Sequence, residues 1–232
     1  MQERNEYDQI VGPKISNWQP SKWPEKSALE GRFGSLEPLN IEKHAKALFE
    51  AFQRDNSGSS WTYLPYGPFA DFSVFNDFLK SLLGDDPLFY AVIDARTKLP
   101  VGLTSFLWIT PVHGVIEIGH LHFSSYLKKS SLATEAIYLM MCSAFDELSY
   151  RRLEWKCDAL NEPSRKAALR LGFTFEGIFR QDKIVKERSR DTAWFSIIDS
   201  EWPKIKSKLE KWLAPTNFDV NGMQIKRLSD IN

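Results

Sequence analysis

Three short stretches of the chain carry side chains whose types and spacing suit chemistry. In "VIEIGHLHF", Glu117, His120 and His122 offer a carboxylate and two imidazoles, groups that often move protons near neutral pH. In "LKKSSLATEA", residues 127–136, two lysines and two serines come just before an apolar helical pattern. In "NEPSRKAALRLGF", residues 161–173, an asparagine opens a short helical pattern that a glycine closes. Together these stretches indicate proton transfer beside an anion-binding turn.

The second stretch is a polar elbow between a strand pattern and a helix pattern. The apolar positions from Leu132 to Leu148 keep helical spacing. The first amides of such a helix have no intrahelical acceptor and lie at the positive end of its dipole, so they can hold a phosphate. Lys128 and Lys129 add positive charge. The alternative is that the serines only cap the helix and the lysines are solvated.

The elements that must position these stretches follow one another in a clear order. Residues 88–109 show two strands around a polar turn, and residues 114–124 show a third, which predicts an antiparallel meander. A strand, a long helix and another strand call for a crossover, and hence for a parallel pair at Phe123 and Leu153. The sheet is therefore predicted to be mixed. Further helices are predicted at 40–55, 71–84, 161–172 and 201–213, and two more strands at 173–199.

Composition limits the kind of protein. The chain has 232 residues, 43% of them hydrophobic, and its 30 basic and 30 acidic side chains balance. Nothing here favours a nucleic-acid or membrane partner. Cys142 and Cys157 have no metal-site spacing, the N-terminus lacks the apolar core of a secretion signal, and no apolar run approaches a membrane span. We expect a cytoplasmic protein, with a nuclear location as the alternative, no metal, and a monomer or homodimer.

Domain boundaries follow from changes in composition. Residues 1–26 are polar and rich in proline, with Trp18 and Trp23 as large anchors, which predicts an arm lying on the domain surface. Residues 27–213 form the predicted domain. Residues 214–232 are expected to be a loosely held polar tail.

Taken together, the three stretches resemble the motifs of the GCN5-related N-acetyltransferases (GNAT superfamily), and within it the ribosomal-protein-alanine acetyltransferase type. "EIGH" is similar to that family's central strand, where E-I-G precedes an aromatic residue. Residues 128–133 occupy the family's Q/R-x-x-G-x-G/A turn, and "TEA" follows as written. Asn161 and the terminal "LGF" of the third stretch stand at family spacing. The resemblance spans about residues 29–199 and implies an α/β (α+β) fold, a mostly antiparallel twisted sheet of about seven strands with helices on both faces.

The resemblance also implies a co-substrate, acetyl-CoA, and residues that hold it. Ser131 departs from the family's glycine, so its side chain either crowds the phosphate or donates its hydroxyl to it. The residues expected to bind the coenzyme are Phe123, Lys128, Lys129, Ser130, Ser131, Leu132, Ala133, Thr134 and Asn161.

Acetylation of an amine needs a base, because an ammonium has no lone pair. Glu117 is the first candidate, acting directly or through water, and His120 is the second. The two have opposite strand parity unless a bulge of the kind seen in the family intervenes. The family's usual acid, a tyrosine, is replaced by Ala168. Ser164 matches the serine of ribosomal-type members and either donates a proton to the thiolate or caps the helix, and Asn161 either contacts the pantetheine arm or caps.

The acceptor side is expected to come from the loop "WTYLPYGPF". Trp61, Tyr63, Tyr66 and Phe69 either wall an acceptor pocket, since aromatic faces attract ammonium groups, or pack as core. The charged run 180–192 is predicted to be a solvated face. The predicted activity is direct transfer of acetyl from acetyl-CoA to a protein N-terminus or a small amine in a ternary complex. The alternative is a coenzyme-A-binding regulatory protein that has lost turnover.

Overall fold

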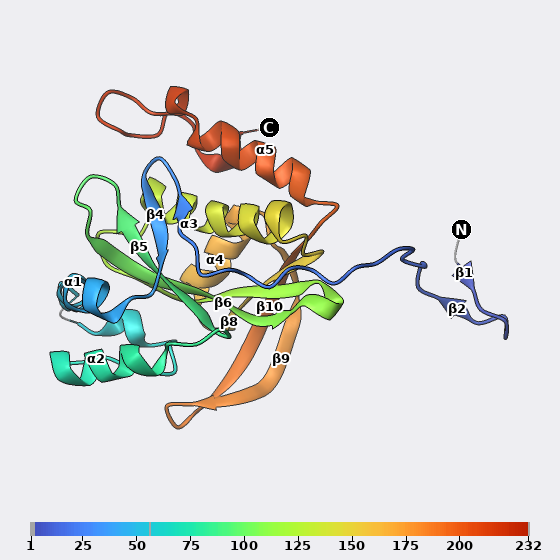
Figure 1. The fold of residues 1–232 in the computed structure, drawn as a ribbon, viewed down its shortest axis with the longest axis horizontal. Helices are drawn as coiled ribbons and strands as arrows, with labels where there is room; N and C mark the ends of the chain where they lie inside the picture. The colour runs from blue at the N-terminus through green and yellow to red at the C-terminus, as the bar shows by residue number, and fades with distance from the viewer. Residues whose placement is uncertain (1–2, 56, 232) are drawn as a thin grey trace.

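A computed structural model describes residues 3–55 and 57–231. Within these residues eight strands form one sheet in the order β3-β4-β5-β6-β7-β8-β10-β9, and among them only β7 and β8 are parallel neighbours (Figure 1). The fold class is therefore as predicted, with one strand more than the seven expected. The strands are β3 (Leu29–Glu30), β4 (Gly34–Pro38), β5 (Leu88–Asp94), β6 (Pro100–Thr110), β7 (Val115–Phe123), β8 (Arg152–Asp158), β9 (Thr174–Val185) and β10 (Arg188–Ile198).

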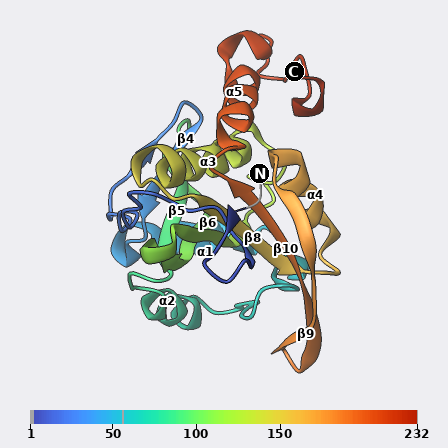
Figure 2. The same cartoon turned by 90° about the vertical axis from the view of Figure 1, so that its right-hand side faces the viewer.

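Helices cover both faces of this sheet (Figure 2). On one face lie α1 (Ile41–Gln53) and α2 (Phe72–Ser81). On the other lie α3 (Ser131–Cys142), α4 (Glu162–Leu171) and α5 (Trp202–Leu213). Asn40 caps α1 by accepting a hydrogen bond from the amide of Lys43, and Asp71 caps α2 by accepting from the amides of Ser73 and Val74. The long helix predicted for 130–150 keeps α geometry only to Cys142, and residues Ser143–Glu147 widen into a π turn.

Strand β5 shows why the sheet is buried on both sides. Its side chains alternate, so Leu88, Tyr90 and Val92 pack against α3 while Phe89 and Ala91 pack against α1 and α2. All seven residues of β5 are buried. A strand with two buried faces reads as a continuous apolar run, which is the pattern that the sequence shows here.

The parallel pair β7–β8 is short. In the part of the chain that the structure describes, the two strands pair only over Val115–Glu117 of β7, with Glu117 opposite Glu154. The predicted parallel neighbours are correct, but Phe123 does not pair with Leu153, because Leu153 lies opposite Ile116. Beyond Glu117 the strands separate, and the sheet opens at this point.

A β-bulge lies in the same part of β7. Across the β6–β7 ladder, Leu103 faces His122 and Ser105 faces Gly119, so β7 holds one extra residue. His120 has a left-handed φ of 52°, which is unusual for a side chain of its size. In a regular strand Glu117 and His120 would point to opposite faces. The bulge brings both side chains to the same side of β7.

A buried carboxylate joins α3 to the turn between β3 and β4. Glu135 is 5% exposed and accepts hydrogen bonds from the backbone amides of Arg32, Phe33 and Gly34, at 2.9, 2.6 and 3.1 Å. Gly31 allows this close approach, since an added Cβ there would lie 2.6 Å from the carboxyl group of Glu135. The "TEA" glutamate thus holds the first helix turn of α3 in place and does not face the ligand.

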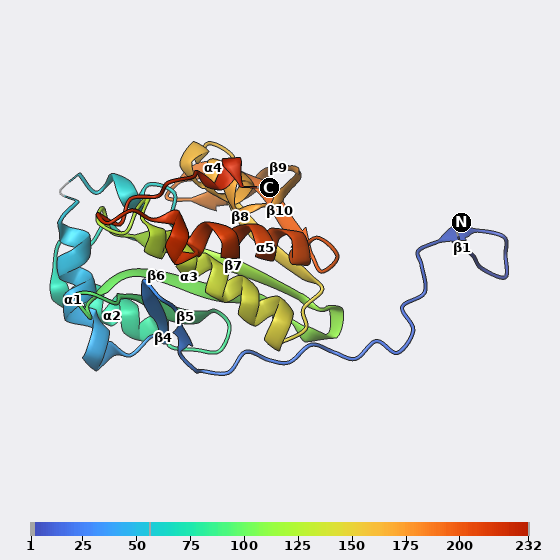
Figure 3. The ribbon, with the colours of Figure 1, turned by 90° about the horizontal axis from the view of Figure 1, so that it is seen from above.

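The N-terminal arm is only partly held on the surface. Ser21 bonds to Pro111 and Ser149, and the Trp18 ring nitrogen donates to the carbonyl of Val112 at 3.0 Å. The preceding residues, with the small hairpin β1 (Glu3–Arg4) and β2 (Ile10–Val11), project away from the sheet (Figure 3). The expectation of an arm lying along the surface therefore applies to its second half.

The C-terminal tail is packed, which corrects the prediction of a loose segment. Asn217 is buried, and its amide group donates to the carbonyls of Trp212 and Lys226. Leu228 is 2% exposed and joins the core beside α5. A few apolar anchors in an otherwise polar sequence suffice to hold the segment. Among residues 3–55 and 57–231 we find no helix with the length and apolarity needed to cross a membrane.

Candidate active site

A cavity of about 1550 Å³ lies where β7 and β8 separate. Its wall includes Glu117 to Phe123 of β7, Trp155 to Asp158 of β8, the elbow before α3 and the start of α4. The volume exceeds the roughly 300–1,000 Å³ usual for a small-ligand site, so the cavity has room for a long ligand and a second molecule. Its large size follows from the missing strand pairing beyond Glu117.

The elbow forms one end of the cavity. Ser130 is the N-cap of α3, and its hydroxyl accepts a hydrogen bond from the amide of Ala133 at 3.0 Å. The amides of Ser131 and Leu132 therefore remain as first-turn donors without an intrahelical acceptor. Lys129 has a left-handed φ of 61°, so the elbow is a tight turn held by its neighbours. All residues from Lys128 to Thr134 line the cavity.

The two elbow serines differ in their surroundings. Ser130 caps the helix, whereas the hydroxyl of Ser131 has no hydrogen-bond partner among the described residues and lies in the cavity wall. A free hydroxyl at the first turn is a donor suited to an anion. Phe123, at the end of β7, completes this side of the wall.

The start of α4 forms the wall beside the elbow. Asn161 is the N-cap of α4, and its side chain accepts a hydrogen bond from the amide of Ser164. The Ser164 hydroxyl in turn accepts a hydrogen bond from the Trp155 ring nitrogen at 3.0 Å. That bond leaves the hydroxyl hydrogen of Ser164 available for donation. Ala168, where the family's tyrosine would stand, is fully buried against the core.

Glu117 lies at the other end of the cavity in a buried ion pair. Its side chain is 6% exposed, and its Oε2 atom is 2.8 Å from the Nζ atom of Lys156. Burial raises the pKa of Glu117, while the neighbouring Lys156 ammonium opposes the rise. Lys156 also contacts Glu154 at 2.8 Å and lies 4.0 Å from the centre of the Trp194 ring. The carboxylate is thus held in place, and its elevated pKa favours the acceptance of a proton.

The two histidines of β7 are neutral at pH 7. Burial lowers the pKa of His120 to about 4 and that of His122 to about 3. The Nδ1 atom of His120 lies 2.9 Å from the Tyr66 hydroxyl, and His122 lies 3.6 Å, centroid to centroid, from the Trp61 ring. His120 lines the cavity beside Glu117, but its lowered basicity makes it the weaker base of the two.

The aromatic residues of the loop 61–69 lie partly in the hydrophobic core and partly in the wall of the cavity. Trp61, Tyr66 and Phe69 pack with Phe75 and Phe78 of α2, and Trp61 is 4% exposed. Only Tyr63 of the four predicted aromatics lines the cavity, and its hydroxyl donates to the carbonyl of Leu160 at 3.1 Å. For the other three the structure favours the second alternative, packing as core, because they belong to the cluster formed with α1 and α2.

The cavity wall includes cationic residues that the sequence did not single out. Lys183 of β9 and Arg190 of β10 line it, although their run was predicted to be a solvated face. In the described residues no group of His, Cys, Asp and Glu is arranged to hold a metal ion. The pairing of β9 with β10 places Lys183 opposite Arg190, and the spacing of the two residues in the sequence does not reveal this register.

This fold and site define a class of protein. A mixed sheet opens between two parallel strands, with the N-terminus of α3 and the buried Glu117 carboxylate both in the wall of the opening. A profile described as "Acetyltransferase (GNAT) domain" matches residues 35–174, more than half of the chain. The chain belongs to the GNAT acetyltransferase family.

Known proteins agree with this assignment. The chain is similar to a crystal structure of a GCN5-related N-acetyltransferase from Brucella melitensis, at 47% identity and a TM-score of 0.90, covering 93% of this chain and 98% of that one. A GNAT-family structure from Chromobacterium violaceum is 40% identical, with a TM-score of 0.78, over 84% of this chain and 98% of that one. An uncharacterized N-acetyltransferase, p20, from Bacillus licheniformis is 30% identical over 60% of this chain and 80% of its own length.

Proposed function

We propose that this protein is an acetyl-CoA-dependent N-acetyltransferase that moves an acetyl group directly to an amine in a ternary complex. The observation that carries the proposal is one continuous cavity with first-turn amides of α3 at one end and the buried Glu117 carboxylate at the other. Anionic groups suit the first end, and an amine that must lose a proton suits the second.

The elbow is the proposed site for the phosphates of acetyl-CoA. The amides of Ser131 and Leu132 supply N–H donors, the Ser131 hydroxyl supplies another, and Lys128 and Lys129 supply charge. When bound, acetyl-CoA supplies the thioester that the amine attacks. These residues fit the group because their donors have no protein acceptor, whereas a regulatory role alone would require no carboxylate at the far end.

The reaction also requires two proton movements, and the proposal assigns one residue to each. Glu117 accepts a proton from the incoming ammonium, while Lys156 fixes the position of the carboxylate. Ser164 is proposed to donate its hydroxyl hydrogen toward the departing thiolate, since Trp155 already occupies an acceptor site on the oxygen. The acceptor is proposed to be a protein N-terminus, as the ribosomal-type motifs suggest, or a small amine.

A second candidate function, a coenzyme-A-binding regulator without turnover, is favoured by one specific observation. The position of the family's tyrosine acid is the buried Ala168, which offers no proton. This candidate and the enzyme make the same prediction for coenzyme binding. They differ only in whether any amine is acetylated.

Glu117→Gln separates the two candidates. Gln keeps the size of the side chain but cannot accept the proton, so amine acetylation by this variant should fall about 100-fold or more with acetyl-CoA binding preserved. Activity is measured as release of free thiol, and binding as the rise in melting temperature with acetyl-CoA. Glu50→Gln, which changes an exposed carboxylate on α1 outside the cavity, is the control and should keep full activity. Absence of any melting shift in the unmodified protein would refute the proposed function, whereas binding with no acetylation would support the regulator.

A further inference from the structure

Two basic side chains face each other across the β9–β10 hairpin. Lys183 and Arg190 are direct register partners, and both line the cavity. Like charges directly opposite each other in an antiparallel pair destabilise the sheet. The repulsion lowers the stability of the β9–β10 pairing, and an anion bound between the two cations would offset it.

Neither cation is neutralised by the protein. Among the described residues, no ion pair or side-chain hydrogen bond joins Lys183 or Arg190 to an acid, and the buried Nε atom of Arg190 has no partner. The carboxylates on neighbouring positions are engaged elsewhere. Asp182 accepts a hydrogen bond from Thr192, Asp191 accepts one from the amide of Gln181, and Asp158 accepts one from the amide of Leu160.

The third cation in this region is different, because Lys156 is matched by two carboxylates, Glu117 and Glu154, each at 2.8 Å. Of these three cations, Lys183, which is exposed, and Arg190, which is half-buried, are therefore the two without a carboxylate partner among the described residues. A buried donor without an acceptor is uncommon in proteins and points to a ligand atom.

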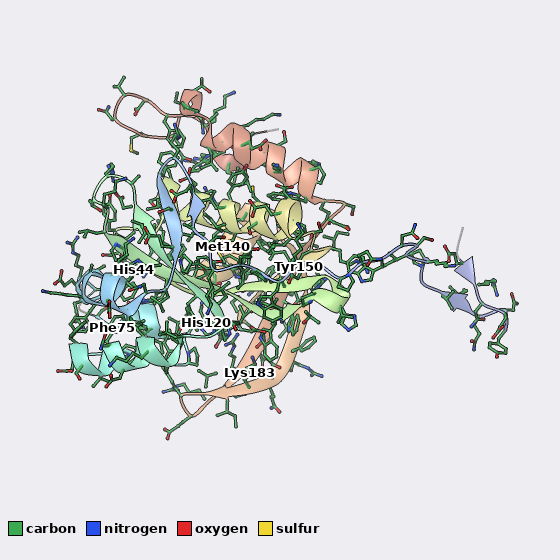
Figure 4. All side chains as sticks on the ribbon, in the orientation of Figure 1. His44, Phe75, His120, Met140, Tyr150 and Lys183 are labelled. Carbon is green, nitrogen blue, oxygen red and sulfur yellow. The ribbon has the colours of Figure 1, made fainter. Side chains whose placement is uncertain are left out.

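The two cations act on different parts of the cavity wall, since the charge of Arg190 acts on Cys157 of β8. The Lys183 charge acts on Glu117 and His120, the groups at the proton-accepting end. Figure 4 shows Lys183 on β9 and His120 on the neighbouring part of β7, below the helices α3 and α5. The phosphates proposed for the elbow have Lys128 and Lys129 beside them. A second anion is thus called for where the acceptor would enter.

We propose that Lys183 and Arg190 bind an anionic group of the acceptor, so that the substrate is an amine bearing a carboxylate or a phosphate. The inference rests on the proposed acetyltransferase function and narrows its substrate class. A polycationic amine is disfavoured at this site because it would meet two unpaired cations. The carboxylate or phosphate can belong to a small molecule or to an acidic side chain near a peptide N-terminus.

Matched acceptors test the inference. Acetylation is measured with phosphoethanolamine against ethanolamine, with the dipeptide amide Ser-Asp against Ser-Asn, and with spermidine. We expect the anionic member of at least one pair to have a kcat/KM at least tenfold higher than its neutral partner, and spermidine to be the poorest acceptor. Preference within the first pair indicates a small-molecule source, and preference within the second indicates a peptide.

Variants connect that preference to the two cations. Lys183→Gln and Arg190→Gln should each raise the KM of the anionic acceptor about tenfold or more, with little change for the neutral partner and an unchanged Kd for acetyl-CoA. Arg190→Lys should restore part of the preference. Arg188→Gln removes the same charge from an exposed position of β10 outside the cavity and should have no effect.

Three results would overturn the inference. Equal kcat/KM within both pairs would show that no anion is recognised, and a weakened acetyl-CoA Kd in the Gln variants would assign the cations to the coenzyme instead. If no amine is acetylated, binding replaces turnover as the test. Phosphoethanolamine and ethanolamine are then titrated by calorimetry into the protein bound to coenzyme A, and phosphoethanolamine binding no tighter than ethanolamine overturns the inference. Failure of acetyl-CoA to raise the melting temperature would instead refute the proposed function itself.

Discussion

Burial determines the chemistry of the two β7 histidines. The pKa of His120 is lowered to about 4 and that of His122 to about 3, against 6.5 for a free side chain. A group whose pKa is depressed on folding contributes stability above its unfolded pKa and loses it as pH falls toward the folded value. Between pH 7 and pH 5 the unfolded chain takes up protons at both histidines and the folded protein does not.

We therefore expect the free energy of unfolding to fall by about 2 kcal/mol for each of these histidines between pH 7 and pH 5. His122→Gln should make the total loss smaller by about 2 kcal/mol, whatever its own effect on packing. Urea denaturation at the two pH values measures it. His113→Gln, at an exposed position, is the control and should leave the loss as it is in the unmodified protein. Equal losses in His122→Gln and the unmodified protein would contradict the prediction.

Sequence patterns located the residues of the site better than they assigned contacts. Glu117, Asn161 and the elbow were proposed from their places in a strand or at a helix start together with the family motifs, and the structure brings them to the wall of one cavity. For Trp61 and Phe69 the sequence left core and pocket wall open, because an aromatic ring suits either position until its neighbours are known. The cationic pair was missed for a related reason, since strand register rather than spacing brings Lys183 and Arg190 together.

At the scale of the elements, the N-terminus of α3 leads to a prediction about hydrogen exchange. Its amides at Ser131 and Leu132 have no intrahelical acceptor, whereas the amide of Ala133 is already bonded to Ser130. Coenzyme A bound at the elbow should slow hydrogen exchange at Ser131 and Leu132 about tenfold or more, with little change at Ala133. Exchange is followed residue by residue by NMR.

Helix α1 provides the internal control for this measurement. Asn40 caps it by accepting a hydrogen bond from Lys43, the same position that Ala133 holds in α3. Its first two residues, Ile41 and Glu42, should exchange at the same rate with and without coenzyme A. Protection at these two residues equal to that at Ser131 and Leu132 would show a global effect rather than binding at the elbow.

The order and type of the main elements follow from the sequence, because long periodic segments and their caps are local signals. Other features depend on tertiary contacts. The π turn at Ser143–Glu147, the bulge at His120 and the early separation of β7 from β8 leave no such signal. The bulge and the separation are the features that create the cavity.

At the scale of the whole molecule, the two ends of the chain differ in how firmly they are held. The tail places Leu228 in the core, while Val220 in the same tail is fully exposed. Leu228→Ala should lower the free energy of unfolding by about 2–5 kcal/mol, the usual cost of such a cavity. Val220→Ala should change it by less than about 0.5 kcal/mol. Urea denaturation measures both.

Removal of residues 1–16 extends the comparison to the other end. Because the β1–β2 hairpin projects from the sheet, we expect this truncation to change stability by less than about 1 kcal/mol (Figure 3). A loss as large as that of Leu228→Ala would mean that the hairpin contacts the domain in solution.

The tail also lies beside the site, since Asn221, Gly222, Met223 and Gln224 line the same cavity as the elbow. This placement matters for any practical handling of the protein. A tag or a surface attachment inserted at residues 221–224 would sit beside the cavity, whereas one fused to the projecting N-terminal hairpin would stand clear of it (Figure 3). Ligand screens and immobilised assays are therefore best built through the N-terminus.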